Sequence, residues 1–516
     1  DEALQEYETI LELDPGLKAA YNQLGYLYAE RGDFATGLAF MDKYQELAAD
    51  EPNPYDSRGE ILMFSGRFEE AVEQFKIALS KRPDFMNSIK GLRQAYGELD
   101  DFENAMKFAD RAINSAASEY TQALTYVDQA LLSWRFDRIL EAQEALKKAQ
   151  QLFPALVNPA LIGGEMYRSI GDRAAAQQLQ RKYLNWFRRT KLNTEIDNES
   201  LYAMLHFSLE ADLPPEELLP VVETITAGET RGMQRQLYDI YLSTLNIRAG
   251  NYSQARTYLK SQNEIFLNLL TRVRPSPRND SWKYSIEAIR LLPPEKTPDY
   301  TYFDQLIARA QRADRQDVEV MGRLLRAQYH EKNARLDDMA SEYVSTGLPR
   351  EGEWMVIGPF SNRGGFHKEF PPEEKIDLSA SYRSGKRSLN WQTAEDGVHD
   401  GYVDLGAILQ SSSWAVGYGA INIYSPDKRS VQLRLSTDEA CKLWVNGKLV
   451  WQVFRQGSVA FDNDIVSVIL HPGNNKVLLK VSNSIKDWGF YFRVTDEKGN
   501  GFPDIKFVSL DKNIRA

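Results

Sequence analysis

Small residues recur at a fixed interval of 34 positions through the first third of the chain. Gly37, Ala71 and Ala105 are 34 residues apart, and after a slip of three residues the series continues at Ala142 and Ala176. In several units a larger apolar residue follows four positions later. A period of this length indicates a solenoid, because one unit cannot bury its apolar face without its neighbours.

A short turn recurs between the two helices expected in each unit. Its sequence is Gly-Asp-Phe at 32–34, Gly-Arg-Phe at 66–68 and Gly-Asp-Arg at 171–173, with Gly-Asn-Tyr at 250–252. Glycine lets the first helix end in a left-handed conformation, and the aromatic residue packs between the helices. Together with the segment AAYNQLGYLYAERGDF, this pattern resembles the tetratricopeptide repeat (TPR).

The resemblance implies a right-handed TPR α-solenoid over residues 1–190. Five antiparallel helix pairs are expected between residues 18 and 190, with the small residues at close helix crossings. Residues 191–270 are expected to form degenerate TPR-like helices, and the match is loose over 236–270. Residues 1–15 fit only the second helix of a unit, which leaves room for a lipid anchor upstream.

The composition changes at residue 271. The segments TRVRPSPRND and LLPPEKTPDY contain five prolines between them, and proline interrupts helices. Helical spacing of apolar residues returns in the segments that follow. We therefore expect a Pro-containing helical connector over residues 271–352.

Beyond Glu353 the period of the apolar residues falls to two. Apolar and polar residues alternate over 431–435, 442–445 and 477–482, which is typical of strands. Asn446-Gly447 is a strong hairpin signal, because both residues tolerate positive φ. Eight or more short strands within residues 353–516 predict a β-sandwich.

The order of these segments is similar to that of the galactose-binding-like jelly-roll modules found in bacterial envelope and secreted proteins. The similarity is carried by WMVIGPF, by the WVNGK hairpin, and by a late LLKV strand followed by WGFYFR. It implies either a sugar-binding module or a purely structural one. The expected fold class is thus a multidomain α plus β chain, a TPR solenoid followed by a jelly-roll β-sandwich.

The sequence offers little for catalysis or metal binding. Its five histidines are widely separated, and none lies in a spacing that places metal ligands on one helix face. The single cysteine, Cys441, lies in an alternating strand and is expected to be a buried thiol. Asp462-Asn463-Asp464 leaves a structural calcium site open, and no other cofactor or metal is indicated.

Charge and hydropathy restrict the partners. The net charge is −11, and the acidic excess disfavours nonspecific nucleic-acid binding, which needs clustered Lys and Arg. No run of apolar residues approaches the length of a membrane span.

In tetratricopeptide arrays the first helix of each pair lines the concave groove, and the resemblance assigns a protein-binding role to the matching side chains. These are Asn22, Tyr26, Asn53, Asp56, Glu60, Asn87, Lys90, Gln94, Val127, Leu131, Trp134, Arg135, Glu165 and Arg168. They do not form the basic clamp that chaperone-binding members use for a C-terminal carboxylate.

Sugar binding would need an exposed aromatic ring beside hydrogen-bonding groups. The candidates in the β region are Trp391, Asp438, Asn446, Trp451, Trp488, Tyr491 and Arg493. A glycan site requires at least one of the three tryptophans to present its ring to solvent.

We therefore expect a non-enzymatic scaffold or adaptor that assembles protein partners through the groove and a docking sandwich. The combination resembles bacterial periplasmic or outer-membrane lipoproteins, which implies a cell-envelope location. Two alternatives stay open: a carbohydrate-binding protein that recognises surface glycan, and the accessory region of an enzyme whose catalytic domain lies upstream.

Overall fold

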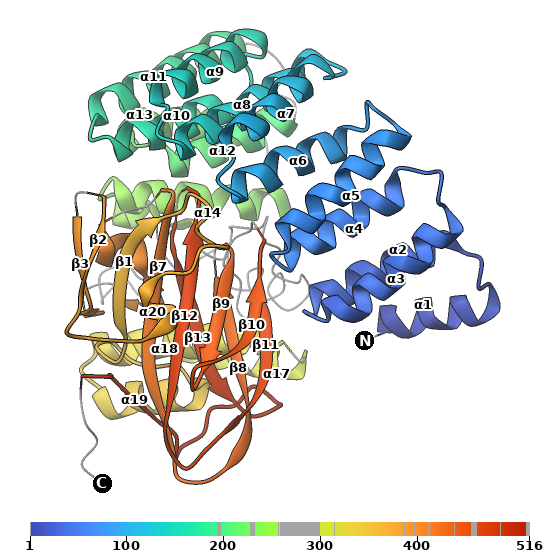
Figure 1. The fold of residues 1–516 in the computed structure, drawn as a ribbon. Helices are drawn as coiled ribbons and strands as arrows, with labels where there is room; N and C mark the ends of the chain where they lie inside the picture. The colour runs from blue at the N-terminus through green and yellow to red at the C-terminus, as the bar shows by residue number, and fades with distance from the viewer. Residues whose placement is uncertain are drawn as a thin grey trace.

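A computed structural model shows a helical solenoid that arches over a β region (Figure 1). The two bodies lie side by side along much of the solenoid, and three further helices lie against the β region on another side. The structure describes residues 2–192, 198–227, 233–255, 257–258, 300–313, 315–385, 387–395, 398–399, 401–410, 413–437, 439–455, 462–485 and 487–511.

The predicted helix pairs between residues 18 and 190 are present. Their five small residues are buried, and the four alanines have no exposed surface. The helices are α1 (Glu2–Leu13), α2 (Lys18–Glu30), α3 (Phe34–Leu47), α4 (Asn53–Phe64), α5 (Phe68–Lys81), α6 (Met86–Glu98), α7 (Phe102–Asn114), α8 (Glu119–Arg135), α9 (Ile139–Leu152), α10 (Asn158–Ser169) and α11 (Arg173–Thr190). The 34-residue period therefore marks real helix crossings.

The first helix of each pair is followed, two positions after its last residue, by a residue with positive φ. At Gly66 the amide donates to the Met63 carbonyl, and the Arg67 amide donates to the Leu62 carbonyl. This pair of bonds satisfies carbonyls that the helix end leaves without a partner. The same position is occupied by Asp100 and Asp137 in the third and fourth pairs.

More helices follow α11 in the described part of the chain. Three of them continue from the solenoid: α12 (Asn198–Glu210), α13 (Pro215–Thr226) and α14 (Met233–Arg248). Three more precede the β region: α17 (Tyr300–Arg312), α18 (Gln316–Lys332) and α19 (Leu336–Thr346). The proline-rich segments of the predicted connector lie outside the described residues.

The β region contains two larger antiparallel sheets and one hairpin. The seven-stranded sheet has the order β10-β9-β12-β7-β1-β4, with β14 also on β7; the five-stranded sheet has the order β11-β8-β13-β6-β5; β2 pairs with β3. Strand bounds are β1 (Met355–Ser361), β2 (Ser381–Ser384), β3 (Arg387–Asn390), β4 (Gln392–Thr393), β5 (Val398–His399), β6 (Tyr402–Asp404), β7 (Ala415–Ser425), β8 (Arg429–Thr437), β9 (Cys441–Val445), β10 (Lys448–Val453), β11 (Asp464–Leu470), β12 (Gly473–Asn483), β13 (Gly489–Thr495) and β14 (Lys506–Val508). Two short helices, α20 (Pro371–Glu374) and α21 (Leu405–Leu409), lie between strands.

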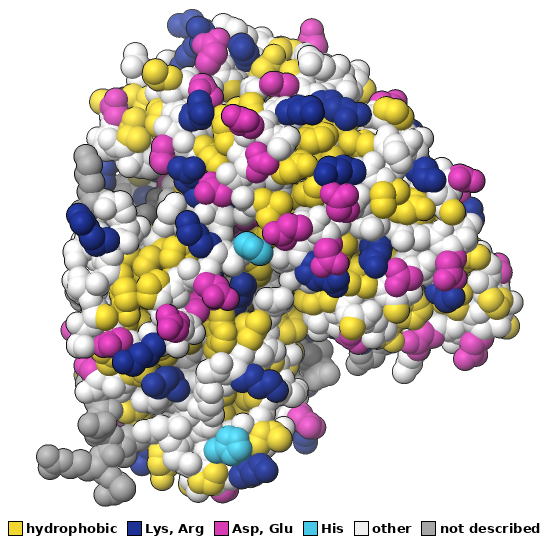
Figure 2. All heavy atoms as spheres, in the orientation of Figure 1, with side chains coloured by type: hydrophobic (Ala, Val, Ile, Leu, Met, Phe, Trp, Pro, Cys, Tyr) yellow, Lys and Arg dark blue, Asp and Glu magenta, His cyan; other side chains and the backbone are white. Residues whose placement is uncertain are grey.

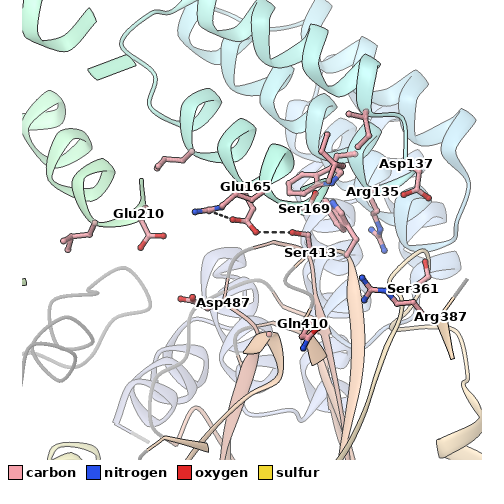
Figure 3. A pocket seen from close by; sticks show the side chains of 18 of the residues that line it. Arg135, Asp137, Glu165, Ser169, Glu210, Ser361, Arg387, Gln410, Ser413 and Asp487 are labelled. Carbon is pink, nitrogen blue, oxygen red and sulfur yellow. Dashed lines mark hydrogen bonds and ion pairs between the residues drawn. The ribbon is translucent and has the colours of Figure 1, made fainter. Parts of the chain in front are cut away.

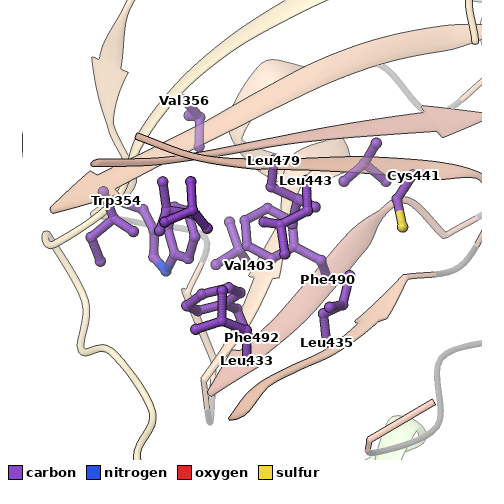
Figure 4. Close-up of a cluster of buried hydrophobic side chains, with 14 of the residues drawn as sticks. Trp354, Val356, Val403, Leu433, Leu435, Cys441, Leu443, Leu479, Phe490 and Phe492 are labelled. Carbon is purple, nitrogen blue, oxygen red and sulfur yellow. The ribbon is translucent and has the colours of Figure 1, made fainter. Parts of the chain in front are cut away.

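The two larger sheets share one hydrophobic core (Figure 4). Leu433 and Phe490 of the five-stranded sheet belong to the same buried cluster as Leu443 and Leu479 of the seven-stranded sheet. Cys441 lies in this core, and burial raises the pKa of its thiol to about 12. The alternation in the sequence thus marks core-facing strand residues, while the assignment to the jelly-roll family stays a prediction.

The helices α17 to α19 are tied to the five-stranded sheet by buried arginines. Arg493 donates to the Thr346 carbonyl at 2.9 Å, and Arg434 donates to the Gln316 side chain at 2.8 Å. Both guanidinium groups also contact Asp462, at 2.7 and 2.9 Å. No helix in the described part of the chain is long and apolar enough to span a membrane.

Candidate functional site: the cleft between solenoid and β region

The β region docks against the turns between the paired helices of the solenoid. The indole of Trp451 packs on Gly32, and the ring of Phe366 packs on Gly66. A methyl group at Gly66 would come within 2.7 Å of the Phe366 ring, so only a bare backbone allows this approach.

Hydrogen bonds and aromatic rings join the two bodies at the second turn. The Phe454 amide donates to the Phe64 carbonyl at 2.8 Å, and the Gln452 side chain donates to the Ser65 carbonyl at 2.9 Å. The rings of Phe68, Phe366 and Phe454 form a cluster with centroids 5.0 to 6.2 Å apart. The contact is therefore both apolar and directional.

Charged groups dominate the next two turns. Arg363 of the β region pairs with Asp100 at 3.1 Å. Arg135, at the end of α8, makes a bidentate pair with Glu98 at 2.6 and 2.9 Å and also donates to the Asn362 carbonyl. Arg135 and Glu98 are 8% and 5% exposed, so this pair is buried where the two bodies meet.

Beyond α8 the solenoid and the β region separate and leave a cleft of about 870 Å³ (Figure 3). Its walls come from the ends of α8, α10, α12 and α14 on one side and from loops of the β region on the other. The lining residues are Trp134, Arg135, Asp137, Ile139, Leu161, Glu165, Arg168, Ser169, Ile170, Leu209, Glu210, Arg248, Ser361, Arg387, Gly406, Gln410, Ser413, Trp414 and Asp487.

The centre of the cleft combines aromatic rings with fixed charges. Trp134 and Trp414 stack edge to face, with centroids 6.1 Å apart, and the Arg135 guanidinium lies 5.5 Å from the Trp414 ring. Glu165 pairs with Arg168 and accepts a hydrogen bond from Ser413 at 3.4 Å. Such mixed surfaces recognise polypeptides well, since Trp and Arg are enriched among the residues that dominate binding.

Four of the predicted groove residues meet in this cleft: Trp134, Arg135, Glu165 and Arg168. The other ten do not line it; they are Asn22, Tyr26, Asn53, Asp56, Glu60, Asn87, Lys90, Gln94, Val127 and Leu131. Several of these bind one another or nearby residues. The Tyr26 hydroxyl donates to Glu60, and Ser88 donates to Asp56 at 2.6 Å.

Asp56 is the most perturbed acid of the predicted groove. It is 2% exposed, and burial raises the pKa of its carboxyl to about 6, although the hydrogen bond from Ser88 opposes the shift.

The predicted glycan residues do not form one site. Trp391 and Trp488 are 7% and 1% exposed, so neither can present its ring face to a sugar, and Arg493 is fully buried. Trp451 is partly buried and packs on Gly32, Tyr491 packs toward α17 to α19, and Asn446 bonds Asn475 and Lys476 at its hairpin turn. Asp438 lies outside the described residues.

The carboxylates of the segment 462–464, where the sequence leaves a calcium site open, are held by arginines. Asp462 is engaged by Arg434 and Arg493, and Asp464 is engaged by Arg455 at 2.5 Å. Cationic side chains occupy the carboxylates that a calcium ion would need. Within the described residues no group of three His, Cys, Asp or Glu side chains could hold a metal.

The cleft residues from the β region were not predicted. Ser413, Trp414, Arg387 and Asp487 are in or beside loops. A positive φ at Trp414 is unusual for a bulky residue, and no sequence pattern predicts it.

Known proteins match parts of the chain at low identity. The chain is 27% identical over 130 residues to mouse Superkiller complex protein 3, covering 25% of this chain and 8% of that protein. It is 31% identical over 96 residues to human Tetratricopeptide repeat protein 13, covering 19% and 11%. It is 26% identical over 182 residues to rat DnaJ homolog subfamily C member 3, covering 35% and 32%. The matched segments thus span a third or less of these relatives, and no family model matches the chain.

Solved structures also align with about a third of the chain. YrrB, described as a TPR protein with an unusual peptide-binding site, aligns with 35% of this chain and 91% of its own, at 17% identity and a TM-score of 0.27. PilW, a type IV pilus biogenesis factor, aligns with 36% and 84%, at 16% identity and a TM-score of 0.31. The 34-residue helix pairs and the sequence relatives establish a TPR-type helical repeat at the N-terminus, followed by an antiparallel β region.

Proposed function

We propose that the protein is a non-enzymatic scaffold that holds a polypeptide segment of a partner protein in the cleft between α8–α14 and the β region. The observation that carries the proposal is the cleft itself, which is lined by the inner ends of solenoid helices and closed on the far side by β-region loops. TPR-type repeats commonly present such surfaces to protein partners.

The docked β region supports this function by fixing the shape of the groove. Solenoids bend because each unit contacts only its neighbours. Here the turns at Gly32, Gly66 and Asp100 each contact a residue of the β region. These contacts fix the position of the helices that precede those lining the cleft. A preorganised groove loses less entropy when a partner binds.

Site-specific photocrosslinking in native cells tests the proposal. A photoreactive residue at Ser169, in the cleft, should capture a discrete protein, whereas the same residue at Tyr202, an exposed position outside the lining, should not. The capture should be lost with Ile170→Asp, which places a charge on an exposed cleft residue, and kept with Leu140→Asp, which changes an exposed residue outside the lining. If Ile170→Asp leaves the amount of captured protein unchanged, the partner does not bind in the cleft.

We propose a bacterial cell envelope as the location, which rests only on the similarity of the β region to envelope-associated modules. Cell fractionation with an antibody to the native protein tests this directly. Recovery in the cytoplasmic fraction would contradict it.

A further inference from the structure

The five helix pairs end their first helices in equivalent left-handed residues. These are Gly32, Gly66, Asp100, Asp137 and Gly171, with φ values of 76, 77, 61, 61 and 83°. The spacing is 34 residues except for the slip of three before Asp137. Each turn therefore offers a partner the same backbone shape, with either a bare glycine or a carboxylate at its tip.

The β region shows what these turns bind. The two glycine turns at positions 32 and 66 each receive an aromatic ring, from Trp451 and Phe366. The aspartate turn at position 100 receives the guanidinium of Arg363. One continuous segment, Arg363-Gly364-Gly365-Phe366, thus fills two neighbouring turns with an arginine and an aromatic residue three positions apart.

The segment that bridges these two turns is bent. Gly364 has a φ of 60°, and the Lys368 amide donates to the Gly364 carbonyl at 2.8 Å. A compact turn therefore presents Arg363 and Phe366 to two neighbouring turns of the solenoid.

The turns at Asp137 and Gly171 also offer an aspartate and a glycine at neighbouring positions, but in the opposite order along the chain from Gly66 and Asp100. A segment with the arginine before the aromatic residue must therefore cross them in the opposite direction to residues 363–366. Asp137 and Ile170 line the cleft, and Ile170 is 50% exposed. Among the described residues, none comes within 4 Å of a methyl group built on Gly171, and none forms an ion pair with Asp137. The carbonyls equivalent to those of Phe64 and Ser65 belong to Ser169 and Ile170, which are exposed.

We propose that Asp137 and the Ile170-Gly171 turn form a paired socket for a partner segment with an arginine and an aromatic residue three positions apart. The arginine pairs with the Asp137 carboxylate, and the aromatic ring packs on Gly171 against Ile170. The inference rests on the proposed function, because the socket lies at the edge of the same cleft, and it adds the chemistry of the ligand.

A labelled peptide with the sequence of residues 360–369, FSNRGGFHKE, is the probe, and its binding to the full chain is followed by fluorescence anisotropy. Saturable binding is expected, with a loss of about tenfold or more when the second phenylalanine is replaced by alanine. Replacing the arginine should weaken binding about twofold to fivefold, since exposed ion pairs contribute modestly.

Variants of the protein locate the binding. Gly171→Asn keeps a residue that tolerates positive φ but fills the socket, so affinity should fall about tenfold or more. Asp137→Asn removes only the charge, and its effect should match that of the arginine-free peptide. Asp172→Asn is the matched control, because its side chain caps α11 through the Ala175 amide and faces a different group.

Three outcomes separate this inference from the proposed function. Equal binding by the phenylalanine-free peptide, or by Gly171→Asn, overturns the socket. If the photocrosslinked partner is captured at Ser169 and the peptide does not compete, the cleft binds protein but the assigned ligand chemistry is incorrect. If the peptide binds as expected while no partner is captured, the result supports the socket and contradicts the proposed scaffold function.

Discussion

At the scale of single residues, Asp56 is a carboxyl group that the fold holds away from water at a cost in stability. Its folded pKa of about 6 lies above its ordinary value of 3.8, so the folded state binds more protons than the unfolded state between these values. Stability therefore falls as the pH rises through this range, by up to about 3 kcal/mol.

Asp56→Asn should remove this loss. The amide can still accept a hydrogen bond from Ser88, so the variant should be more stable than the wild type at pH 7.5 and similar to it near pH 4. Urea unfolding at the two pH values measures the difference. Asp84→Asn, at an exposed position, is the control, and an identical response of both variants would contradict the burial argument.

Arg135 tests the opposite situation, a buried charge that is fully paired. Arg135→Ala leaves the Glu98 carboxylate buried without its partner, so the free energy of unfolding should fall by about 3 to 5 kcal/mol. For this reason its replacement by alanine is not a clean test of partner binding, and neither is that of Trp134, which is 4% exposed.

A second variant shows whether the unpaired charge causes the loss. Arg135→Met combined with Glu98→Leu removes both charges and keeps apolar volume, so it should recover most of the stability. A double variant that is as unstable as Arg135→Ala would instead assign the loss to the missing bond to the Asn362 carbonyl.

At the scale of helices and strands, the small residues set how closely paired helices approach. Ala71 has no exposed surface at the crossing of its helix pair, so Ala71→Leu should lower the free energy of unfolding by about 1 to 3 kcal/mol through overpacking. Chemical denaturation measures the change. Ala39→Leu, at an exposed position of α3, should change stability by about 0.5 kcal/mol or less.

The elements were predictable because their signals are local. The glycine turns and the strand alternation depend on residues close together in the sequence, and the 34-residue period repeats one such short pattern in each helix pair. The turns at Asp100 and Asp137 were missed because aspartate replaces glycine there, although aspartate also tolerates positive φ.

The cleft could not be predicted in the same way. Gly66 and Phe366 are 300 positions apart, and neither residue carries a local pattern that names its partner. The repeat therefore predicted Trp134 and Arg135 as groove residues, but it could not predict the loops that bury them.

At the scale of the whole molecule, the docking of the solenoid onto the β region should make the two bodies unfold together. Phe68 belongs to the solenoid, whereas Phe366 and Phe454 belong to the β region, and their rings form one buried cluster. Cooperativity between bodies requires such an apolar contact, because a small polar interface lets each body open independently.

Replacing Phe366 and Phe454 together by alanine should uncouple the two bodies. Each phenylalanine truncation in a packed core costs about 3 to 5 kcal/mol, and the two losses are not additive because the rings touch each other. We expect calorimetry to show one main transition for the wild type and two for the double variant. Phe360→Ala is the matched control, since that ring is 3% exposed but packs on Phe370 and Tyr418 within the β region. It should lower the transition temperature of the β region without separating a second transition from it. A single transition in the double variant would mean that the hydrogen bonds to Phe64 and Ser65 and the Arg135 contact suffice to couple the bodies.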